Sequence, residues 1–170
     1  MKLHDSIIVN GHAYAKGDDV PWIAVYPLFL LHMLVFGGSG FAAAYGFSDV
    51  PVPFLYLQGG GAIWIYTLLY LVIFGRDDVK WMFINAALGV LGIVSQMDWI
   101  LSLFGRHMGD FPPYVHVIPF LYFVLYTFLI RHAFLDLFGA REDETKRKRV
   151  EFGYVGATVA TYLLTHFLES

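Results

Sequence analysis

The side chains with the clearest capacity for chemistry are five polar residues that stand inside or at the edges of long uncharged stretches. These residues are Gln58, Gln96, Asp98, His116 and His166. Carboxylate and imidazole groups exchange protons, imidazole ligates metals, and amides bind polar solutes through hydrogen bonds. Polar groups are costly to bury in apolar surroundings, so these positions are the first candidates for a binding or transport site.

Metal and haem binding set stricter requirements. Asp98, His116 and His166 are suitable ligand types for a metal, but no tight spacing such as His-x-x-x-His joins them. A haem b held by two histidines needs both at one depth, which only His116 and His166 satisfy. The sequence therefore favours neither cofactor.

No catalytic motif accompanies these residues. The chain lacks a nucleophile elbow, a His-Glu-x-x-His pair, a phosphate-binding loop and paired carboxylates. It has no cysteine, which excludes disulfides and cysteine-ligated clusters. Asp98 and His116 could form the acid–base couple of an intramembrane enzyme that modifies lipid, but no residue identifies a substrate. The sequence therefore favours a non-enzymatic protein.

The composition indicates that membrane-spanning elements position these residues. Hydrophobic residues make up 58% of the chain and charged residues only 15%, whereas soluble domains carry about 25% charged residues. The excess apolar surface requires a lipid bilayer as a partner. No nucleic-acid partner is expected, and the net charge of −3 itself says little, because the placement of charges decides the topology of membrane proteins.

Uncharged stretches of about 20 residues cross a bilayer as helices. The sequence predicts an all-α, polytopic transmembrane helix bundle of five spans that together make residues 22–170 a single transmembrane domain. The predicted spans are 22–47, 53–74, 81–104, 113–138 and 152–168. The fifth, with 17 uncharged residues, is the shortest. The fourth helix is expected to continue past its span to Gly139, because glycine commonly ends helices.

Counting about 1.5 Å per residue along each helix places the polar residues in one layer. Asp98 and Gln96 fall in the outer third of the third span, and Gln58 lies near the outer end of the second. His116 and His166 stand at the outer ends of the fourth and fifth spans. The alternative to a shared site is structural hydrogen bonding or contact with lipid headgroups.

His32 is a separate candidate. It lies about ten residues into the first predicted span, close to the bilayer midplane. A single histidine at this depth can serve as a neutral hydrogen-bond partner between helices, or as a ligand or proton relay.

The distribution of lysine and arginine predicts the orientation. With five spans, nine of the 11 basic residues lie on the side of the N-terminus, Arg106 lies on the other side and Arg131 lies within the fourth helix. The positive-inside rule then predicts a bacterial-type inner (plasma) membrane protein with a cytoplasmic N-terminus and an external C-terminus.

Two polar segments are expected to be ordered. Residues 1–21 form the cytoplasmic N-terminal segment, in which Asn10-Gly11 between short apolar runs predicts a β-hairpin that covers the inner helix ends. Residues 141–149 predict a helix with ion pairs between Glu142 and Lys146 and between Glu144 and Lys148. The basic end of this segment could also contact anionic lipid.

Glycines predict where helices approach one another. Gly37 and Gly40 share one side of the first span and allow close packing. Residues 59–61 are three successive glycines that point in three directions, which predicts a loosened or broken second helix beside a wet cavity, with ordinary packing as the alternative.

Together these features favour an oligomeric channel or small transporter for a small polar or ionic solute. Its site would comprise Asp98, Gln58, Gln96 and His116 in an outer vestibule, and His32 deeper in the membrane. A chain of 170 residues cannot easily enclose a pathway alone, so the hypothesis implies a homo-oligomer. The alternatives are a non-catalytic or haem- or quinone-binding subunit of a larger membrane complex, and an intramembrane lipid-modifying enzyme.

Overall fold

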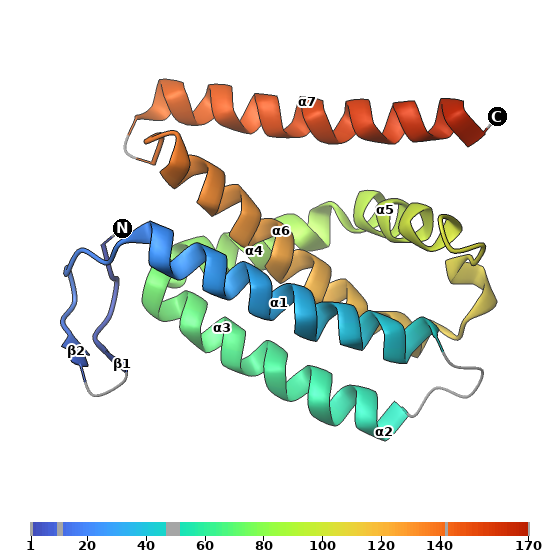
Figure 1. The fold of residues 1–170 in the computed structure, drawn as a ribbon, viewed down its shortest axis with the longest axis horizontal. Helices are drawn as coiled ribbons and strands as arrows, with labels where there is room; N and C mark the ends of the chain where they lie inside the picture. The colour runs from blue at the N-terminus through green and yellow to red at the C-terminus, as the bar shows by residue number, and fades with distance from the viewer. Residues whose placement is uncertain (1, 10–11, 47–51, 142, 170) are drawn as a thin grey trace. The chain divides into compact units, whose positions relative to one another are not determined.

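A computed structural model of the protein describes residues 2–9, 12–46, 52–141 and 143–169. The described chain is mostly helical, with one small hairpin near the N-terminus (Figure 1). The long helices are α1 (Trp22–Tyr45), α3 (Gly60–Phe74), α4 (Arg76–Leu88), α5 (Val90–Ser102), α6 (Val117–Leu137) and α7 (Glu144–Glu169). The short ones are α2 (Val52–Phe54), the π-helical η1 (Leu55–Gly59) and the 3-10 helices η2 (Met108–Asp110) and η3 (Pro113–His116). The chain forms two compact units, Met1–Phe128 and Leu129–Ser170, so α6 belongs to both.

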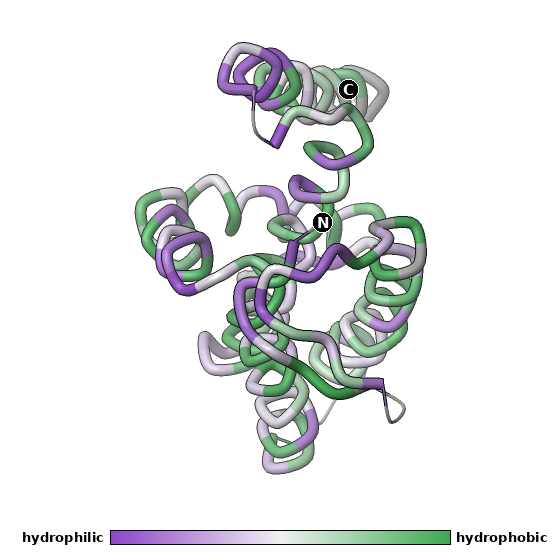
Figure 2. The backbone as a smooth tube through the Cα atoms, turned by 90° about the vertical axis from the view of Figure 1, so that its left-hand side faces the viewer, coloured by the Kyte–Doolittle hydropathy of each residue, from purple (hydrophilic) through white to green (hydrophobic). Residues whose placement is uncertain are grey.

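Three helical stretches among the described residues are long and apolar enough to cross a membrane. They are Val25–Tyr45, Val52–Phe74 and Pro113–Leu137. Helices α4 and α5 qualify only as a pair bent by 76°, which raises the number to four if they form one broken span. Figure 2 shows the apolar residues that run along these helices. The predicted multi-pass helical membrane protein is thereby confirmed, but the count of five is not, because α7 is not among the qualifying helices.

The helix break lies at a different glycine from the one predicted. Gly59 and Gly60 both have helical backbone angles, and η1 continues directly into α3. The helix is therefore continuous through residues 59 and 60, which contradicts a break; the other form of the prediction, a loosened helix, is matched by the π-helical turn that ends at Gly59. The break lies instead at Gly89, where φ is −94° and ψ is 12°, between α4 and α5.

The glycines of the first two spans do make close helix contacts. The aromatic ring of Tyr122 on α6 lies 3.5 to 3.6 Å from the positions that Cβ atoms would occupy on Gly37 and Gly40. A Cβ atom on Gly59 would lie only 2.4 Å from Cγ2 of Ile118. Both contacts hold α6 against its neighbours, which confirms close packing at the first-span glycines.

Tyr70 joins three helices in the core of the first unit. Its side chain is fully buried. Its hydroxyl lies 3.0 Å from the carbonyl oxygen of Leu125 and 2.9 Å from the sulfur of Met33, and these two acceptors compete for or share its single hydrogen. Phe74 and Phe128 pack against its ring with centroids 5.3 and 5.4 Å away. The polar end of this tyrosine is thus satisfied inside an otherwise apolar cluster.

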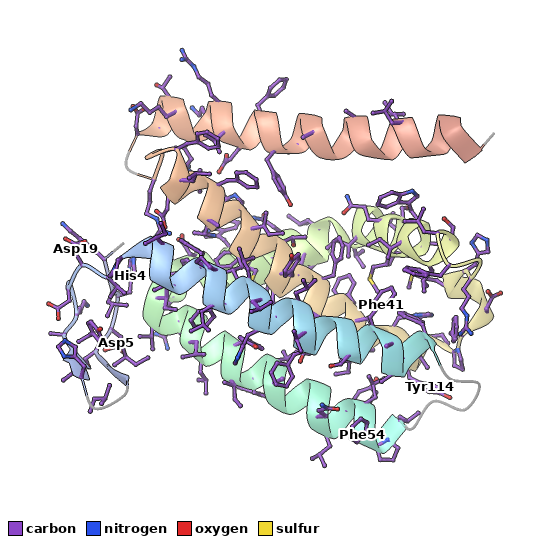
Figure 3. All side chains as sticks on the ribbon, in the orientation of Figure 1. His4, Asp5, Asp19, Phe41, Phe54 and Tyr114 are labelled. Carbon is purple, nitrogen blue, oxygen red and sulfur yellow. The ribbon has the colours of Figure 1, made fainter. Side chains whose placement is uncertain are left out.

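The predicted N-terminal hairpin is present. Strand β1 (Ile7–Val9) pairs antiparallel with β2 (His12–Tyr14), while its Asn10-Gly11 turn lies outside the described residues. The backbone N–H groups of His4 and Asp5 both donate to the carbonyl oxygen of Val72. The segment therefore docks on the C-terminal end of α3, and Figure 3 shows His4 and Asp5 at that end of the first unit.

In the second unit, α6 ends as its glycine predicts. Gly139 has a φ of 57°, and its N–H donates to the carbonyl oxygen of Asp136. The N–H of Ala140 donates to the carbonyl oxygen of Leu135 at 2.7 Å. These two bonds form the glycine-terminated helix end known as a Schellman motif.

Ion pairs order the connection that follows. Asp136 binds Arg141 with both carboxylate oxygens, at 2.7 and 3.0 Å. Arg131 pairs with Glu151 on α7. The predicted pair of Glu144 and Lys148 is present at 2.8 Å. The other predicted pair includes residue 142, which lies outside the described residues.

Asp143 caps the N-terminus of α7. Its carboxylate accepts the backbone N–H groups of Thr145 and Lys146, each at 3.0 Å. The bond from the Lys146 N–H, with smaller contributions from the Thr145 N–H and the charges of Lys146 and Arg149, lowers the pKa of Asp143. The cap therefore favours the ionised carboxylate, as expected at the positive end of a helix.

We predict that this cap weakens in acid. Because the pKa is lower in the folded helix than in the unfolded chain, its contribution is complete above the unfolded value of about 3.9 and is lost as pH falls through the folded value. Hydrogen-exchange protection of the Thr145 and Lys146 amides should fall below about pH 4 and should be low at every pH in Asp143→Ala. Equal protection of these amides in Asp143→Ala and in the parent protein would contradict the capping role.

Candidate functional site

A groove between α1 and the η1–α3 helix brings two of the predicted site residues together. It has a volume of about 470 Å³, and His32 from α1 and Gln58 from η1 both line it. The rest of its lining is apolar or aromatic and includes Phe29, Phe36 and Tyr66. Ligand sites commonly have this composition: apolar side chains surround the ligand, and a few polar groups fix its orientation.

Local structure explains why these side chains face the groove. The π-helical turn of η1, which includes Gln58 and ends at Gly59, is wider than an α-helical turn. Such turns are frequent at functional sites. Gly61 and Ala62 also line the groove, and their small size leaves space beside Gln58. No atom outside the local backbone lies within 4 Å of the position that a Cβ on Gly61 would occupy.

His32 and Gln58 are both exposed on the surface of the first unit. The ring of His32 contacts that of Phe36, with centroids 5.8 Å apart. Within the described part of the chain, neither side chain has a hydrogen-bond partner. An unpaired amide or imidazole in an apolar medium costs about 1–3 kcal/mol, so both groups are available to an external partner.

Asp98 and His116 lie toward the α5–α6 connection, the end of the first unit remote from the hairpin. Asp98 on α5 accepts the backbone N–H of Met108 at 2.6 Å, and its second oxygen lies 3.4 Å from Nδ1 of His107. Asp110 accepts the His107 N–H at 2.8 Å. Asp98 thus anchors η2 against α5, and its side chain is still 41% exposed.

His116 belongs to a second cluster at the same end. Its Nδ1 lies 2.9 Å from the hydroxyl of Tyr45, the last residue of α1, and the two rings are stacked. Arg106 donates to the carbonyl oxygen of Tyr45 and lies 5.9 Å from the ring centroid of Phe111. The Tyr45 ring also packs on Phe111. Tyr45 is therefore the centre of this cluster.

The two clusters are connected through adjacent residues of one loop. Arg106 binds the His116 cluster and His107 faces Asp98. A further bond, from the Tyr56 hydroxyl to the carbonyl oxygen of Tyr114 at 2.7 Å, ties η1 to η3 at this end (Figure 3). Asp98 and His116 are thus brought near each other by the loop, and they make no direct contact among the interactions of the described residues.

Gln96 and His166 complete the predicted set. Gln96 is half-buried on α5 and lines neither the groove of His32 nor the cluster of Tyr45. His166 lies in α7, and its side chain is outside the described residues. The proposed pairing of His166 with His116 as haem ligands therefore stays a prediction.

No group of three metal-ligating side chains comes together among the residues that the structure describes. Of the metal candidates, Asp98 binds the η2 backbone and His116 binds Tyr45. The side chain of the third candidate, His166, lies outside the described residues.

Two residues of this region have roles that the sequence does not predict. Tyr45 reads as an ordinary aromatic residue at a helix end, and Arg106 reads only as the single basic residue on its side. The available signal was Arg106 itself, because an arginine that departs from the charge bias requires a local reason.

Comparison of the chain with protein-family models, with curated proteins and with solved structures finds no match.

Proposed function

We propose that this protein is an oligomeric membrane channel or small transporter for a small polar or ionic solute. The observation that carries the proposal is the pair His32 and Gln58, which face one groove without a hydrogen-bond partner in the described chain. Polar groups at membrane depth mark solute pathways when no internal partner explains them.

Oligomerisation follows from the exposure of these groups. The groove is open at the surface of the first unit and not enclosed within it, so another chain must cover it to exclude lipid. A second copy supplies the same face by symmetry and would double the polar lining. In such an assembly Asp98, Gln96 and His116 belong to the outer mouth, and His32 is the deeper contact.

The proposal includes a topology. We place the fifth span at residues 152–168 in α7, with the N-terminus in the cytoplasm and the C-terminus outside a bacterial-type inner membrane. Nine of 11 basic residues then lie in the cytoplasm or its interface. The location of a C-terminal tag in spheroplasts, by protease accessibility, tests this arrangement directly.

His32→Leu and Gln58→Leu are expected to reduce solute flux about tenfold each, the effect of losing one hydrogen bond of about 1.4 kcal/mol in the pathway. The measurement is shrinkage or swelling of reconstituted liposomes challenged with glycerol, urea or potassium chloride. His32→Gln, which keeps a hydrogen-bonding group, should retain more flux than His32→Leu. His12→Ala, which removes a histidine from strand β2, is the matched control and should behave as the parent protein.

Absence of flux for every probe in the parent protein, or equal flux in His32→Leu, would remove the proposal. Native mass spectrometry from mild detergent provides an independent arm. A homo-oligomer supports the proposal, whereas a monomer or a stoichiometric complex with a different protein contradicts it.

The second candidate is a quinone-binding subunit of a larger complex. It is favoured by the aromatic lining of the groove around two side chains that can donate to a carbonyl oxygen, namely His32 and Gln58. This candidate predicts a co-purifying quinone and a different partner chain in the same mass spectrum. It also predicts no solute flux.

A further inference from the structure

A second groove, separate from that of His32 and Gln58, runs between α1, α5 and α6 of the first unit. Its volume is about 700 Å³, and its lining is almost entirely apolar. The apolar residues that line it include Leu34, Phe41, Ile100, Phe104 and Phe123. No atom outside the local helix lies within 4 Å of the position that a Cβ on Gly38 would occupy, so the wall of the groove is open there.

One charged side chain lines this groove, and it lies toward the α5–α6 loop. Arg106 is the only lysine or arginine between Lys80 and Arg131. Its guanidinium donates to the carbonyl oxygen of Tyr45 and lies over the ring of Phe111. Among the described residues, no carboxylate forms an ion pair with it.

The neighbouring carboxylates do not substitute for such a partner. Asp98 accepts the Met108 N–H and faces His107, and Asp110 accepts the His107 N–H. Arg106 has five N–H donors, and the bond to Tyr45 uses the Nη1 end. The remaining donors of the guanidinium are suited to an oxyanion, which they can bind in a bidentate manner.

The loop lies where a span ends, because Tyr45 closes the first stretch long enough to cross a membrane. Phosphate groups of lipids lie at this level, just beyond the hydrocarbon. The apolar groove suits the acyl chain of a phospholipid. The arginine at its end, which has no carboxylate partner among the described residues, suits the phosphate of the same molecule.

We propose that the groove between α1, α5 and α6 binds an acyl chain of an anionic glycerophospholipid whose phosphate is held by Arg106. The acyl chain occupies the apolar lining beside Gly38, and the guanidinium selects a headgroup with net negative charge. This site shares neither His32 nor Gln58 with the proposed transport function, and it connects to the outer mouth through Tyr45, which contacts both Arg106 and His116.

The test is native mass spectrometry of the full chain in detergent, titrated with phosphatidylglycerol or phosphatidylcholine of the same acyl composition. The parent protein should retain phosphatidylglycerol about tenfold more strongly than phosphatidylcholine, which corresponds to one charge-assisted contact. Arg106→Gln should abolish that preference, and Arg106→Lys should leave an intermediate one. Lys16→Gln, an exposed position outside the spans, should retain it.

A second variant addresses the acyl chain without altering the arginine. Gly38→Leu fills the groove and should reduce the binding of both lipids. Gly92→Leu is its control, because it adds the same side chain at an open helical position that does not line the groove.

Three outcomes would overturn the proposal. Equal retention of the two lipids by the parent protein would remove the role of charge. Unchanged binding in both Arg106→Gln and Gly38→Leu would remove the site. Complete displacement of phosphatidylglycerol by excess inorganic phosphate would show a plain anion site with no acyl-chain contribution.

Discussion

Gly59→Val is expected to lower the free energy of unfolding of the first unit by about 2 kcal/mol, the usual cost of overpacking a close contact. A Cβ at this position would lie 2.4 Å from Cγ2 of Ile118. Ile118 is buried, and its branched side chain has few rotamers that could move the methyl group away. The strain must therefore be relieved by separating η1 from α6. Equilibrium unfolding in mixed micelles of dodecyl sulfate and a mild detergent measures the loss.

The two glycines that follow are the matched controls. No atom outside the local backbone lies within 4 Å of a Cβ built on Gly60 or Gly61. Alanine has a better helix propensity than glycine by about 1 kcal/mol, so Gly60→Ala and Gly61→Ala should be neutral or stabilising. Adding Ile118→Ala to Gly59→Val should recover part of the lost stability. Equal losses of stability on substitution of Gly59, Gly60 and Gly61 would show that the flexibility of the glycine backbone matters here. The contact between Gly59 and Ile118 would then have no special role.

These three glycines also show what a sequence can and cannot predict about this fold. The uncharged stretches predicted the apolar helices, because about 20 apolar residues in a bilayer must satisfy their own backbone hydrogen bonds. Whether a glycine permits a contact or a break depends on what lies opposite it. Gly59 faces Ile118 from α6 and stays helical, whereas Gly89 lies between α4 and α5 and separates them. The facing residues are distant in sequence, so this distinction was beyond sequence reasoning.

The candidate site, too, has features that the sequence predicts and features that it does not. The depth of His32 and of Asp98 along their helices could be counted from the sequence, because helix rise is constant. Their partners could not. Asp98 binds the N–H of Met108 because the intervening loop folds back over α5, and His32 shares a groove with Gln58 because α1 packs against η1. Loop paths and helix pairings depend on tertiary packing, which has no local signal in the sequence.

The predicted fifth span shows how charged residues limit the prediction of spans from uncharged stretches. The predicted stretch 152–168 is continuous with a charged first half, since α7 begins at Glu144 and includes the basic run 146–149. A single helix thus contains a polar segment and a short apolar one. The ion pair of Arg131 on α6 with Glu151 anchors the polar segment of α7 within the second unit. The first part of α7 is therefore held in place independently of its apolar second part.

Asp136→Ala is expected to destabilise the second unit by about 2 kcal/mol, the usual cost of losing a hydrogen bond to a charged group, because its ion pair with Arg141 is partly buried. The side chain of Asp136 is 9% exposed and that of Arg141 is 28% exposed; a hydrogen bond of 3.0 Å from Nη2 of Arg141 and an ion-pair contact of 2.7 Å at its Nε join them. Removing the carboxylate leaves the guanidinium without its bidentate partner. The residues that end α6 and lead into α7 should then lose order. Hydrogen exchange at the amides of Gly139 and Ala140, which bond back to α6, reports this loss.

Glu144→Ala provides the matched control because it also deletes one acid of an ion pair in the same unit. Glu144 and Lys148 are 75% and 73% exposed, and an exposed pair at this helical spacing contributes only about 0.3–0.5 kcal/mol. Protection at Gly139 and Ala140 should therefore be unchanged in Glu144→Ala and strongly reduced in Asp136→Ala. High salt should separate the two pairs further, since it screens the exposed pair more than the partly buried one. Similar small effects in both variants would mean that the α6 end is held by its glycine-terminated backbone bonds, and that the ion pair of Asp136 and Arg141 is dispensable.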